Sequence, residues 1–216
     1  MTEPNSFPSA MGGPIIEALV QAITANAQLL SELDGATGDG DHGVNMAKGF
    51  AQARRRIPQV VEFSAGLDAI GEVLLDDIGG AMGPLYGTFF QEVARSCRGQ
   101  ETIDGTVFGK MLDAGTQAVL EVGGAQVGDK TLVDTLVPAR DVYRIAIGSG
   151  VEFPAALRAM TEAAQVGQQS TADLVAKVGR ASRLGERSRG SLDAGATSCF
   201  LILKALADSM CALMAA

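Results

Sequence analysis

Hydrophobic residues recur every three or four positions along most of this chain, which is the spacing of one face of an amphipathic helix. The first such run covers residues 14–33, where Pro14 suits the first turn of a helix. The same spacing predicts helices over residues 45–56, 63–78, 85–97, 104–122, 153–178 and 196–215. Asp104 is expected to cap the helix that starts beside it.

Glycine-rich loops separate these helices, and they cover residues 34–43, 79–84, 123–130 and 179–195. Two segments have a less clear secondary-structure pattern. Residues 131–137 predict a short helix that Pro138 interrupts, and residues 139–150 could form a helix or, in part, a strand. Because strand signals are otherwise almost absent, the pattern predicts one all-α domain over residues 13–216. Residues 1–12 are expected to form a disordered lead-in.

The composition narrows the class of protein. The chain is 47% hydrophobic, which is ample for a core, and its net charge is −8. Such an acidic chain argues against non-specific nucleic-acid binding and against an anionic membrane partner, because both need a basic surface. We find no apolar run of the ~18 residues that a membrane span needs, and the N-terminus lacks signal-peptide features. The three cysteines include no CxxC pair, so we expect reduced thiols and a cytoplasmic protein.

The segment LDGATGDGDHGVNMAKG, residues 33–49, holds Asp34, Asp39, Asp41 and His42, the sole histidine. Several carboxylates in a tight glycine-rich loop suit a hard cation such as Mg²⁺. The alternative is a glycine turn that only caps helices. The segment also matches GxGxxG, but no strand precedes it, which argues against a dinucleotide site. An EF-hand also fails, because no glutamate closes the loop. The histidine could accept a phosphoryl group, contact phosphate or base, or be a plain loop residue.

Two further loops could bind phosphate. Residues 79–83 lie just before a helix, and bare backbone at a helix N-terminus binds anions, although a tight turn between packed helices is the alternative. Residues 179–195 bring four arginines into an acidic protein, either to grip phosphate or as a solvated basic loop. These are Arg180, Arg183, Arg187 and Arg189. Residues 123–130 match a Walker loop too loosely to count. Together the loops predict a Mg-nucleotide site for phosphoryl transfer.

Four ordered blocks carry a resemblance to a known family: LDGATGDGDHGVNMAKGF, GGAMGPLYGTFF, GDKTLVDTL and GRASRLGERSRGSLDAGATS. They resemble the DhaL family, the nucleotide-binding subunits of bacterial dihydroxyacetone kinases. The blocks span residues 33–198, and the flanking helices fit as well. The resemblance implies a single-domain, eight-helix antiparallel barrel. Such a barrel is closed at one end and holds ADP or ATP with two Mg²⁺ ions at the other.

The resemblance also implies site residues. Asp34, Asp39 and Asp41 match the metal ligands of the family, and with Arg187 they form the implied catalytic set. Nucleotide contacts are implied at His42, Asn45, Ala81, Met82, Gly83, Leu132, Arg187, Asp193, Ala194 and Gly195. Three residues depart from the family pattern and leave nucleotide affinity and the phosphoryl donor open. Met82 replaces a serine, and Ser191 and Ala194 lie where GHxDPGA is common.

The family implies a division of work between subunits. A DhaM-type phosphohistidine protein recharges the bound nucleotide, and the γ-phosphoryl group then passes to dihydroxyacetone held on a DhaK-type subunit. We expect no nucleic-acid or membrane partner, and a homodimer is compatible with the pattern. Two alternatives stay open. One is an ATP-dependent kinase subunit for another ketose, such as erythrulose, and the other is a non-catalytic nucleotide-binding regulatory subunit.

Overall fold

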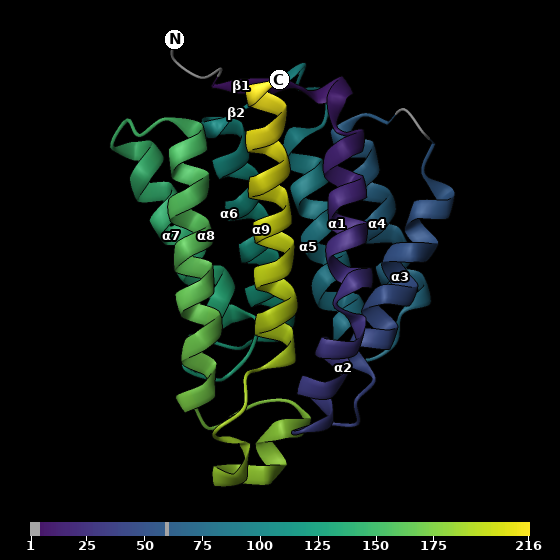
Figure 1. Cartoon of the computed structure of the whole chain (residues 1–216), viewed down its shortest axis with the longest axis vertical. Coiled ribbons are helices and arrows are strands. Elements are labelled where there is room, and N and C mark those ends of the chain that lie inside the picture. The colour runs from purple at the N-terminus through teal and green to yellow at the C-terminus, as the bar shows by residue number, and fades with distance from the viewer. Residues whose placement is uncertain (1–4, 59–60) are drawn as a thin grey trace.

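Helices stand side by side around a hydrophobic core in the computed structural model, which describes residues 5–58 and 61–216 (Figure 1). The described residues form nine α-helices: α1 (Gly13–Ala25), α2 (Ala27–Gly35), α3 (His42–Arg56), α4 (Phe63–Asp77), α5 (Met82–Cys97), α6 (Gly105–Gly123), α7 (Val133–Gly148), α8 (Phe153–Ser170) and α9 (Ala194–Ala215). They also form strands β1 (Ser6–Pro8) and β2 (Thr102–Asp104), and the 3-10 helices η1 (Ser9–Met11), η2 (Thr171–Asp173) and η3 (Arg180–Ser188).

The long helices form a closed ring. From α3 to α9 each helix packs against the next one in the chain, α1 packs against α3, and α9 closes the ring against α1. Successive helices run in opposite directions (Figure 1). The helix expected over residues 14–33 is in fact two, because Asn26 (φ −105°, ψ 12°) breaks it into α1 and α2. If α1 and α2 are taken as one wall, the ring is the expected eight-helix antiparallel barrel.

Apolar side chains fill the interior of the ring. Phe90 of α5 meets Phe50 of α3 and Phe89 of its own helix edge to face, with ring centroids 5.7 Å and 5.3 Å apart. Helices α4 and α5 approach closely because glycines face each other at their contact. A Cβ on Gly71 would lie 3.0 Å from the carbonyl oxygen of Gly87. The barrel is therefore a packed core, and open space is found near its ends.

The N-terminal segment corrects one expectation. Residues 6–11, expected to be disordered, form β1 and η1, and β1 pairs antiparallel with β2. Phe7 lies opposite Ile103 and is 1% exposed, and its ring meets Phe63 at 5.7 Å. A lone aromatic residue among polar neighbours gave no periodic signal, so only its tertiary contacts order this segment. Residues 1–4 lie outside the described part of the chain.

Helix α7 corrects a second expectation. It continues through Pro138 to Gly148, so the predicted interruption is wrong and the unclear segment 139–150 is helical up to that glycine. A proline removes the N–H that would bond the carbonyl of Asp134, four residues earlier. Helix α8 packs against this carbonyl so closely that a Cβ on Gly167 would lie 2.2 Å from its oxygen. Packing against α8 therefore maintains a turn that the local sequence disfavours.

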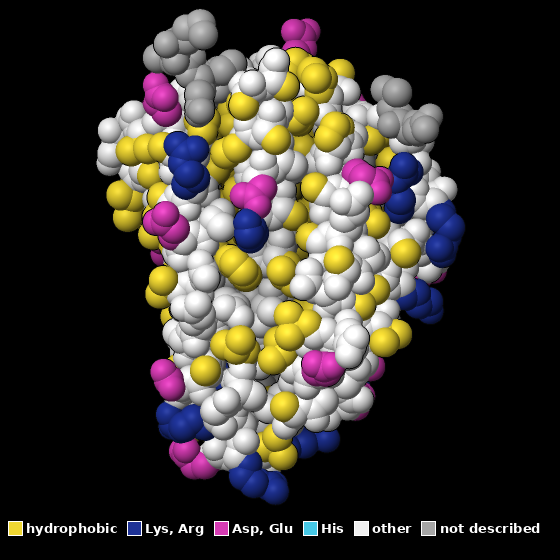
Figure 2. All heavy atoms as spheres, viewed as in Figure 1, with side chains coloured by type: hydrophobic (Ala, Val, Ile, Leu, Met, Phe, Trp, Pro, Cys, Tyr) yellow, Lys and Arg dark blue, Asp and Glu magenta, His cyan; other side chains and the backbone are white. Residues whose placement is uncertain are grey.

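Helix α9 differs from the expectation about apolar runs. Among the described residues, it alone is long and apolar enough to cross a membrane, with a mean hydropathy of 1.6. In the structure it forms a wall of the barrel between α1 and α8. Its residues Ile202, Leu206 and Met210 are buried in the core. Hydrophobic side chains also gather along the middle of the face on which α9 lies (Figure 2). Packing in the barrel accounts for the buried side of α9, which makes up 44% of its most apolar stretch.

The alternating direction of the helices has a consequence for one end of the barrel. Helices α3, α5, α7 and α9 all begin there, at the bottom of Figure 1. Their N-cap residues are Asp41, Ala81, Leu132 and Asp193. A helix N-terminus presents free N–H groups and a partial positive charge. The topology itself thus gathers four anion-attracting helix ends around one space.

Candidate functional site

A cavity of about 550 Å³ opens at this end of the barrel. All four N-cap residues named above line it. One side is polar and carries the acidic loop, whereas Met82, Leu85, Val119, Leu132 and Val133 contribute an apolar side. The volume falls within the usual range for a small-molecule ligand. The cavity can therefore hold a ligand that is anionic at one end and apolar at the other.

Three carboxylates meet at the polar side. Asp34 lies in the last turn of α2, Asp39 lies in the loop, and Asp41 is the N-cap residue of α3. One carboxylate oxygen from each of the three lies within 4.8 Å of the others. Two glycines make this geometry possible. A Cβ on Gly38 would lie 2.6 Å from an Oδ1 atom of Asp34, and Gly40 has a φ of 77°. The structure brings the three aspartates together, and three oxygen donors of this kind suit Mg²⁺.

The cluster is electrostatically strained. Partial burial raises the pKa of Asp41, and the neighbouring carboxylates of Asp39 and Asp34 raise it further. The guanidinium group of Arg180 opposes this shift and forms an ion pair with Asp39. Because like charges at this distance repel, the cluster favours the arrival of a further cation.

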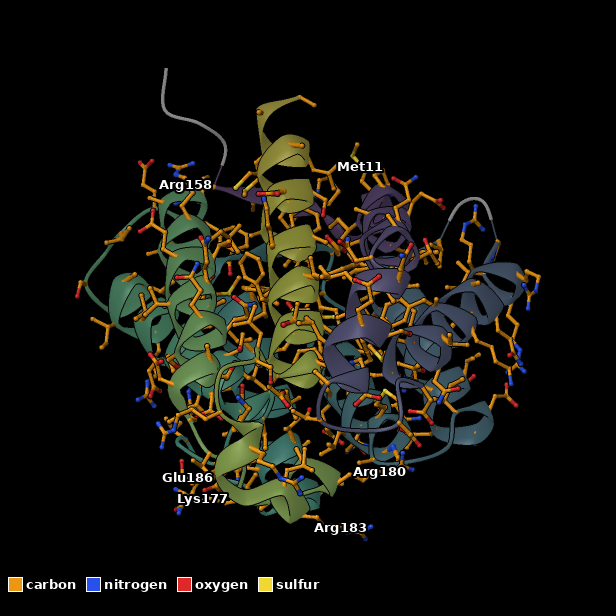
Figure 3. The ribbon with its side chains drawn as sticks, turned by 60° about the horizontal axis from the view of Figure 1, so that its bottom comes forward. Met11, Arg158, Lys177, Arg180, Arg183 and Glu186 are labelled. Carbon is orange, nitrogen blue, oxygen red and sulfur yellow. The ribbon has the colours of Figure 1, made fainter. Side chains whose placement is uncertain are left out.

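The structure selects among the four loop arginines. Arg180 lines the cavity, whereas Arg187, which the family resemblance favoured, is exposed on η3 and does not line it. At the tip of the barrel, Arg180 lies on the side below α2 and α3, and Arg183 points away into solvent (Figure 3). Arg180 follows Gly179, which has a φ of 69°, and this turn directs the chain back toward the acidic loop. No local signal distinguishes it from the other three, so only the fold identifies it.

His42 is buried beneath the cluster at 7% exposure, and its backbone N–H donates to Asp34. Its Nε2 atom lies 2.9 Å from Oγ of Ser198, which lies 2.7 Å from the hydroxyl of Tyr86. Both hydroxyls also reach the carbonyl of Gly195, at 3.1 Å and 2.9 Å. If Nε2 carries a proton, three of these contacts are hydrogen bonds, and if it does not, only two are, since each hydroxyl has one proton. The network therefore favours the Nε2–H tautomer.

Burial lowers the pKa of His42 to about 4, with the carboxylate of Asp34 opposing the shift, so that the ring is neutral near pH 7. A neutral Nε2–H ring presents Nδ1 as an acceptor. The structure thus argues against a protonated histidine that binds phosphate by charge. Neither Tyr86 nor Ser198 was selected from the sequence, because both lie in apolar helical stretches.

The start of α5 supplies part of the cavity wall. Ala81 and Met82, two of the residues implied to contact the nucleotide, line it. Gly83 does not, because it is buried against the end of α4, where a Cβ would lie 2.1 Å from the carbonyl oxygen of Ile78. The glycine at position 83 is therefore needed for helix packing. Asn45 also lies away from the lining, half-buried one turn into α3, where its N–H donates to the carbonyl of Asp41.

The start of α9 supplies the opposite part of the cavity wall. Asp193, Ala194 and Gly195 line the cavity, and the side chain of Asp193 accepts a hydrogen bond from the N–H of Ala196 at 2.7 Å. Burial raises the pKa of Asp193 to about 6, although that hydrogen bond and Lys130 oppose the shift. Lys130 is a further lining residue that was not selected from the sequence.

Comparisons with known proteins all point to one protein family. The family model for the DAK2 domain matches residues 36–208. The chain is 37% identical over 186 residues to "PEP-dependent dihydroxyacetone kinase, ADP-binding subunit DhaL" of Escherichia coli, covering 85% of this chain and 89% of the relative. It is 32% identical over 206 residues to the ADP-binding subunit DhaL of PEP-dependent dihydroxyacetone kinase 2 of Listeria innocua, covering 94% and 95%.

Longer relatives and solved structures match as well. An L-erythrulose 1-kinase of Mycolicibacterium smegmatis is 35% identical over 202 residues, which is 91% of this chain and 35% of that relative. The crystal structure of the C. freundii dihydroxyacetone kinase in complex with AMP-PNP and Mg²⁺ superimposes with a TM-score of 0.66 and 27% identity. That match covers 94% of this chain and 34% of the kinase chain. The chain thus spans about a third of these longer proteins.

Proposed function

This chain belongs to the DAK2-domain family, and from that membership we propose that it is the nucleotide-binding, phosphoryl-transferring subunit of a dihydroxyacetone kinase. The observation that carries the proposal is the convergence of Asp34, Asp39 and Asp41 at the polar side of a cavity ringed by four helix N-termini. Metal-binding oxygens and anion-binding backbone are the two elements that phosphoryl transfer requires.

The three aspartates are the residues that would hold Mg²⁺, as two ions if the family pattern applies. When bound, Mg²⁺ supplies charge neutralisation for the transferring phosphoryl group. The protein itself contributes the N–H groups at the starts of α5 and α9. The guanidinium group of Arg180 lines the same cavity and is the cation best placed to reach phosphate oxygens. We therefore assign to Arg180 the catalytic role that the family resemblance implied for Arg187.

The apolar side of the cavity suits a nucleobase. Leu132, Met82 and Leu85 lie on that side and offer a surface without charge. Met82, which replaces a serine of the family pattern, adds a flexible thioether there and removes a hydroxyl. ADP or ATP would then lie with its base against these side chains and its phosphates toward the aspartates.

We propose that the ketose binds on another subunit. The family resemblance implies a ketose that is held by a histidine of the DhaK-type subunit. The sole histidine of this chain is His42, which is buried with its Nε2 atom against Ser198. A DhaK-type partner would present dihydroxyacetone at the mouth of the cavity. A DhaM-type phosphohistidine protein would recharge ADP in place. A cytoplasmic location follows from this proposal, and a homodimer stays a prediction.

One reconstitution tests the proposal. The purified chain is combined with a DhaK-type subunit and either a DhaM-type donor or ATP, and dihydroxyacetone phosphate is measured. Product with either donor, and native mass spectra showing bound ADP and Mg²⁺, are expected. Product only with erythrulose would move the substrate to that ketose, which the match to erythrulose kinases makes the second candidate. Bound nucleotide without any ketose phosphate would instead indicate a regulatory subunit.

A further inference from the structure

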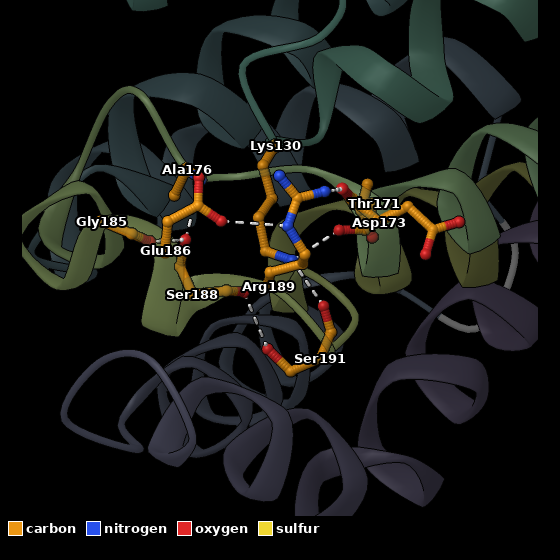
Figure 4. A network of polar contacts seen from close by, with 9 residues as sticks. All are labelled: Lys130, Thr171, Asp173, Ala176, Gly185, Glu186, Ser188, Arg189 and Ser191. Carbon is orange, nitrogen blue, oxygen red and sulfur yellow. Dashed lines mark hydrogen bonds and ion pairs between the residues drawn. The ribbon is translucent and has the colours of Figure 1, made fainter.

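The segment between α8 and α9 forms a flap, defined here as residues 172–190, that lies against the end of the cavity. Its two ends are joined. The N–H of Gly190 donates to the carbonyl of Ala172 at 2.8 Å, and the side chain of Arg189 donates to the carbonyl of Asp173. Inside the flap, Oγ of Ser188 accepts a hydrogen bond from the N–H of Ala176 at 2.9 Å (Figure 4). The flap is therefore a compact loop on a narrow base.

One buried lysine holds that base. The Nζ atom of Lys130, from the loop between α6 and α7, lies 2.5 Å from the carbonyl oxygen of Thr171 and 2.5 Å from that of Ser191 (Figure 4). These two residues directly precede and follow the flap. Lys130 is only 3% exposed, although lysine is almost never buried without a structural or functional reason. A single ammonium group thus bridges both ends of the flap from a third segment of the chain.

The position of Lys130 is conformationally demanding. Its φ is 63°, and among the described residues it is the only non-glycine residue with a positive φ. Asp134 imposes this backbone, because its two carboxylate oxygens accept the N–H groups of Gly128 at 2.6 Å and Thr131 at 2.7 Å. Strained backbone of this kind persists only where its surroundings determine it. The fold therefore directs the ammonium group to the base of the flap at some cost in conformation.

The flap carries a functional group to the site. Arg180 lies on it and ion-pairs with Asp39 of the acidic cluster. Shortly after the flap, Asp193 caps α9, and its own N–H donates to Oγ1 of Thr171 at 3.0 Å. We propose that Lys130 is a positioning residue for phosphoryl transfer: its ammonium group fixes the base of the flap so that Arg180 reaches the acidic cluster. This inference rests on the proposed function of the same site.

The test compares Lys130→Met, which keeps the length of the side chain and removes its donors, with Lys177→Met. Lys177 lies on the flap itself, but its ammonium group is exposed and pairs at 3.4 Å with Asp129. Limited trypsin digestion reports the flap directly, because Arg183, Arg187 and Arg189 lie on it. Lys130→Met should raise cleavage after these arginines about tenfold, by increasing local opening, whereas Lys177→Met, which removes only its own tryptic site, should leave cleavage after the arginines as in the wild type.

Turnover tests the link to Arg180. In the reconstituted kinase, Lys130→Met should lower kcat about as much as Arg180→Ala does, roughly a hundredfold, with a smaller change in KM for the nucleotide. The double variant of Lys130→Met and Arg180→Ala should be no more than about twofold slower than Arg180→Ala alone, because both substitutions remove the same function of Arg180. A double variant in which the two losses multiply would overturn the proposal, as would a protease-resistant flap with normal kcat in Lys130→Met.

A second variant at the same position keeps the test valid if Lys130→Met fails to fold. Lys130→Gln keeps amide N–H donors for the two carbonyls and should give cleavage and kcat values between those of the wild type and Lys130→Met. Cleavage in Lys130→Gln equal to the wild type, with kcat as low as in Arg180→Ala, would also contradict the positioning role. If the wild-type chain transfers no phosphoryl group, the proposed function fails. The digestion still measures whether Lys130 holds the flap.

Discussion

Arg180 and Asp39 form an ion pair that joins the flap before α9 to the loop before α3. The pair is half exposed on both sides, so its own contribution to stability is small. Its importance is geometric, because it brings the guanidinium group beside the carboxylates that would hold a cation. A cation bound at Asp39 would leave the guanidinium group available to phosphate oxygens.

Arg180→Ala should lower the kcat of ketose phosphorylation about a hundredfold or more, as loss of a charge-stabilising arginine does elsewhere. Arg187→Ala removes an exposed arginine of the same flap and should change kcat less than about twofold. Steady-state kinetics with the reconstituted kinase measures both. The reverse result would restore the assignment to Arg187 that the family resemblance implied.

Asp41→Asn should abolish Mg²⁺-dependent nucleotide binding while leaving the barrel folded. Partial burial raises the pKa of Asp41 and the carboxylates of Asp39 and Asp34 raise it further, so removing its charge relieves both the cost of burial and the repulsion. The melting temperature without metal should therefore stay equal or rise slightly, and the increase that Mg-ADP gives the wild type should vanish. Asp208→Asn, on the exposed side of α9, serves as the control. Melting temperatures with and without Mg-ADP are the measurement. A melting temperature of Asp41→Asn that still rose with Mg-ADP would contradict this role.

His42 can be observed directly, since it is the sole histidine of the chain. Nitrogen-15 NMR of the imidazole in metal-free protein should show the Nε2–H tautomer at pH 7 and a pKa near the value of about 4 that burial produces. Ser198→Ala should mix the tautomers. A ring that titrates near 6.5, the ordinary value, or that carries its proton on Nδ1 would contradict the network.

The same pKa shift predicts a pH dependence of stability. The unfolded chain binds a proton on His42 below pH 6.5, whereas the folded chain binds it only below about 4. Unfolding is therefore favoured as the pH falls through this window, by up to about 3 kcal/mol. His42→Gln should lose this part of the pH dependence, which urea unfolding at pH 7 and at pH 4.5 would measure. An unchanged difference between the two pH values in His42→Gln would contradict the prediction.

Glycine substitutions should separate packing from binding in the two glycine-rich loops. A Cβ on Gly43 would lie 1.9 Å from the carbonyl oxygen of Ala27, where α3 crosses α2, whereas a Cβ on Gly79 would meet nothing within 4 Å. Gly43→Ala should destabilise the fold by about 3 kcal/mol or more, and Gly79→Ala by less than about 1 kcal/mol. Chemical denaturation of both variants is the measurement, and equal losses would contradict the close contact.

Phe7→Ala should show that the N-terminal strand is part of the fold. Phe7 is 1% exposed and packs on Phe63, so its truncation should cost about 3–4 kcal/mol of unfolding free energy. Truncation of Met11, which is 49% exposed on the same segment, should cost little. A Phe7→Ala variant as stable as the wild type would restore the picture of a disordered lead-in.

Much of the fold followed from local pattern. Helical spacing located the walls of the barrel, and the cap at Asp104 is present as expected, since its side chain accepts from the N–H of Val107 at 2.8 Å. Local pattern failed where a distant contact outweighed it. Pro138 remains helical because α8 packs beside it, and Phe7 is ordered because Ile103 and Phe63 cover it.

The sequence by itself grouped the three aspartates, because they are close together in the chain and the glycines between them let the backbone turn tightly enough for their oxygens to converge. It could not choose Arg180 over Arg187, or connect Lys130, Tyr86 and Ser198 to the cavity. Those residues lie on segments that meet only when the ring of helices closes. Short sequence separation fixes geometry through the backbone, whereas contacts between distant segments depend on how every helix in between is packed.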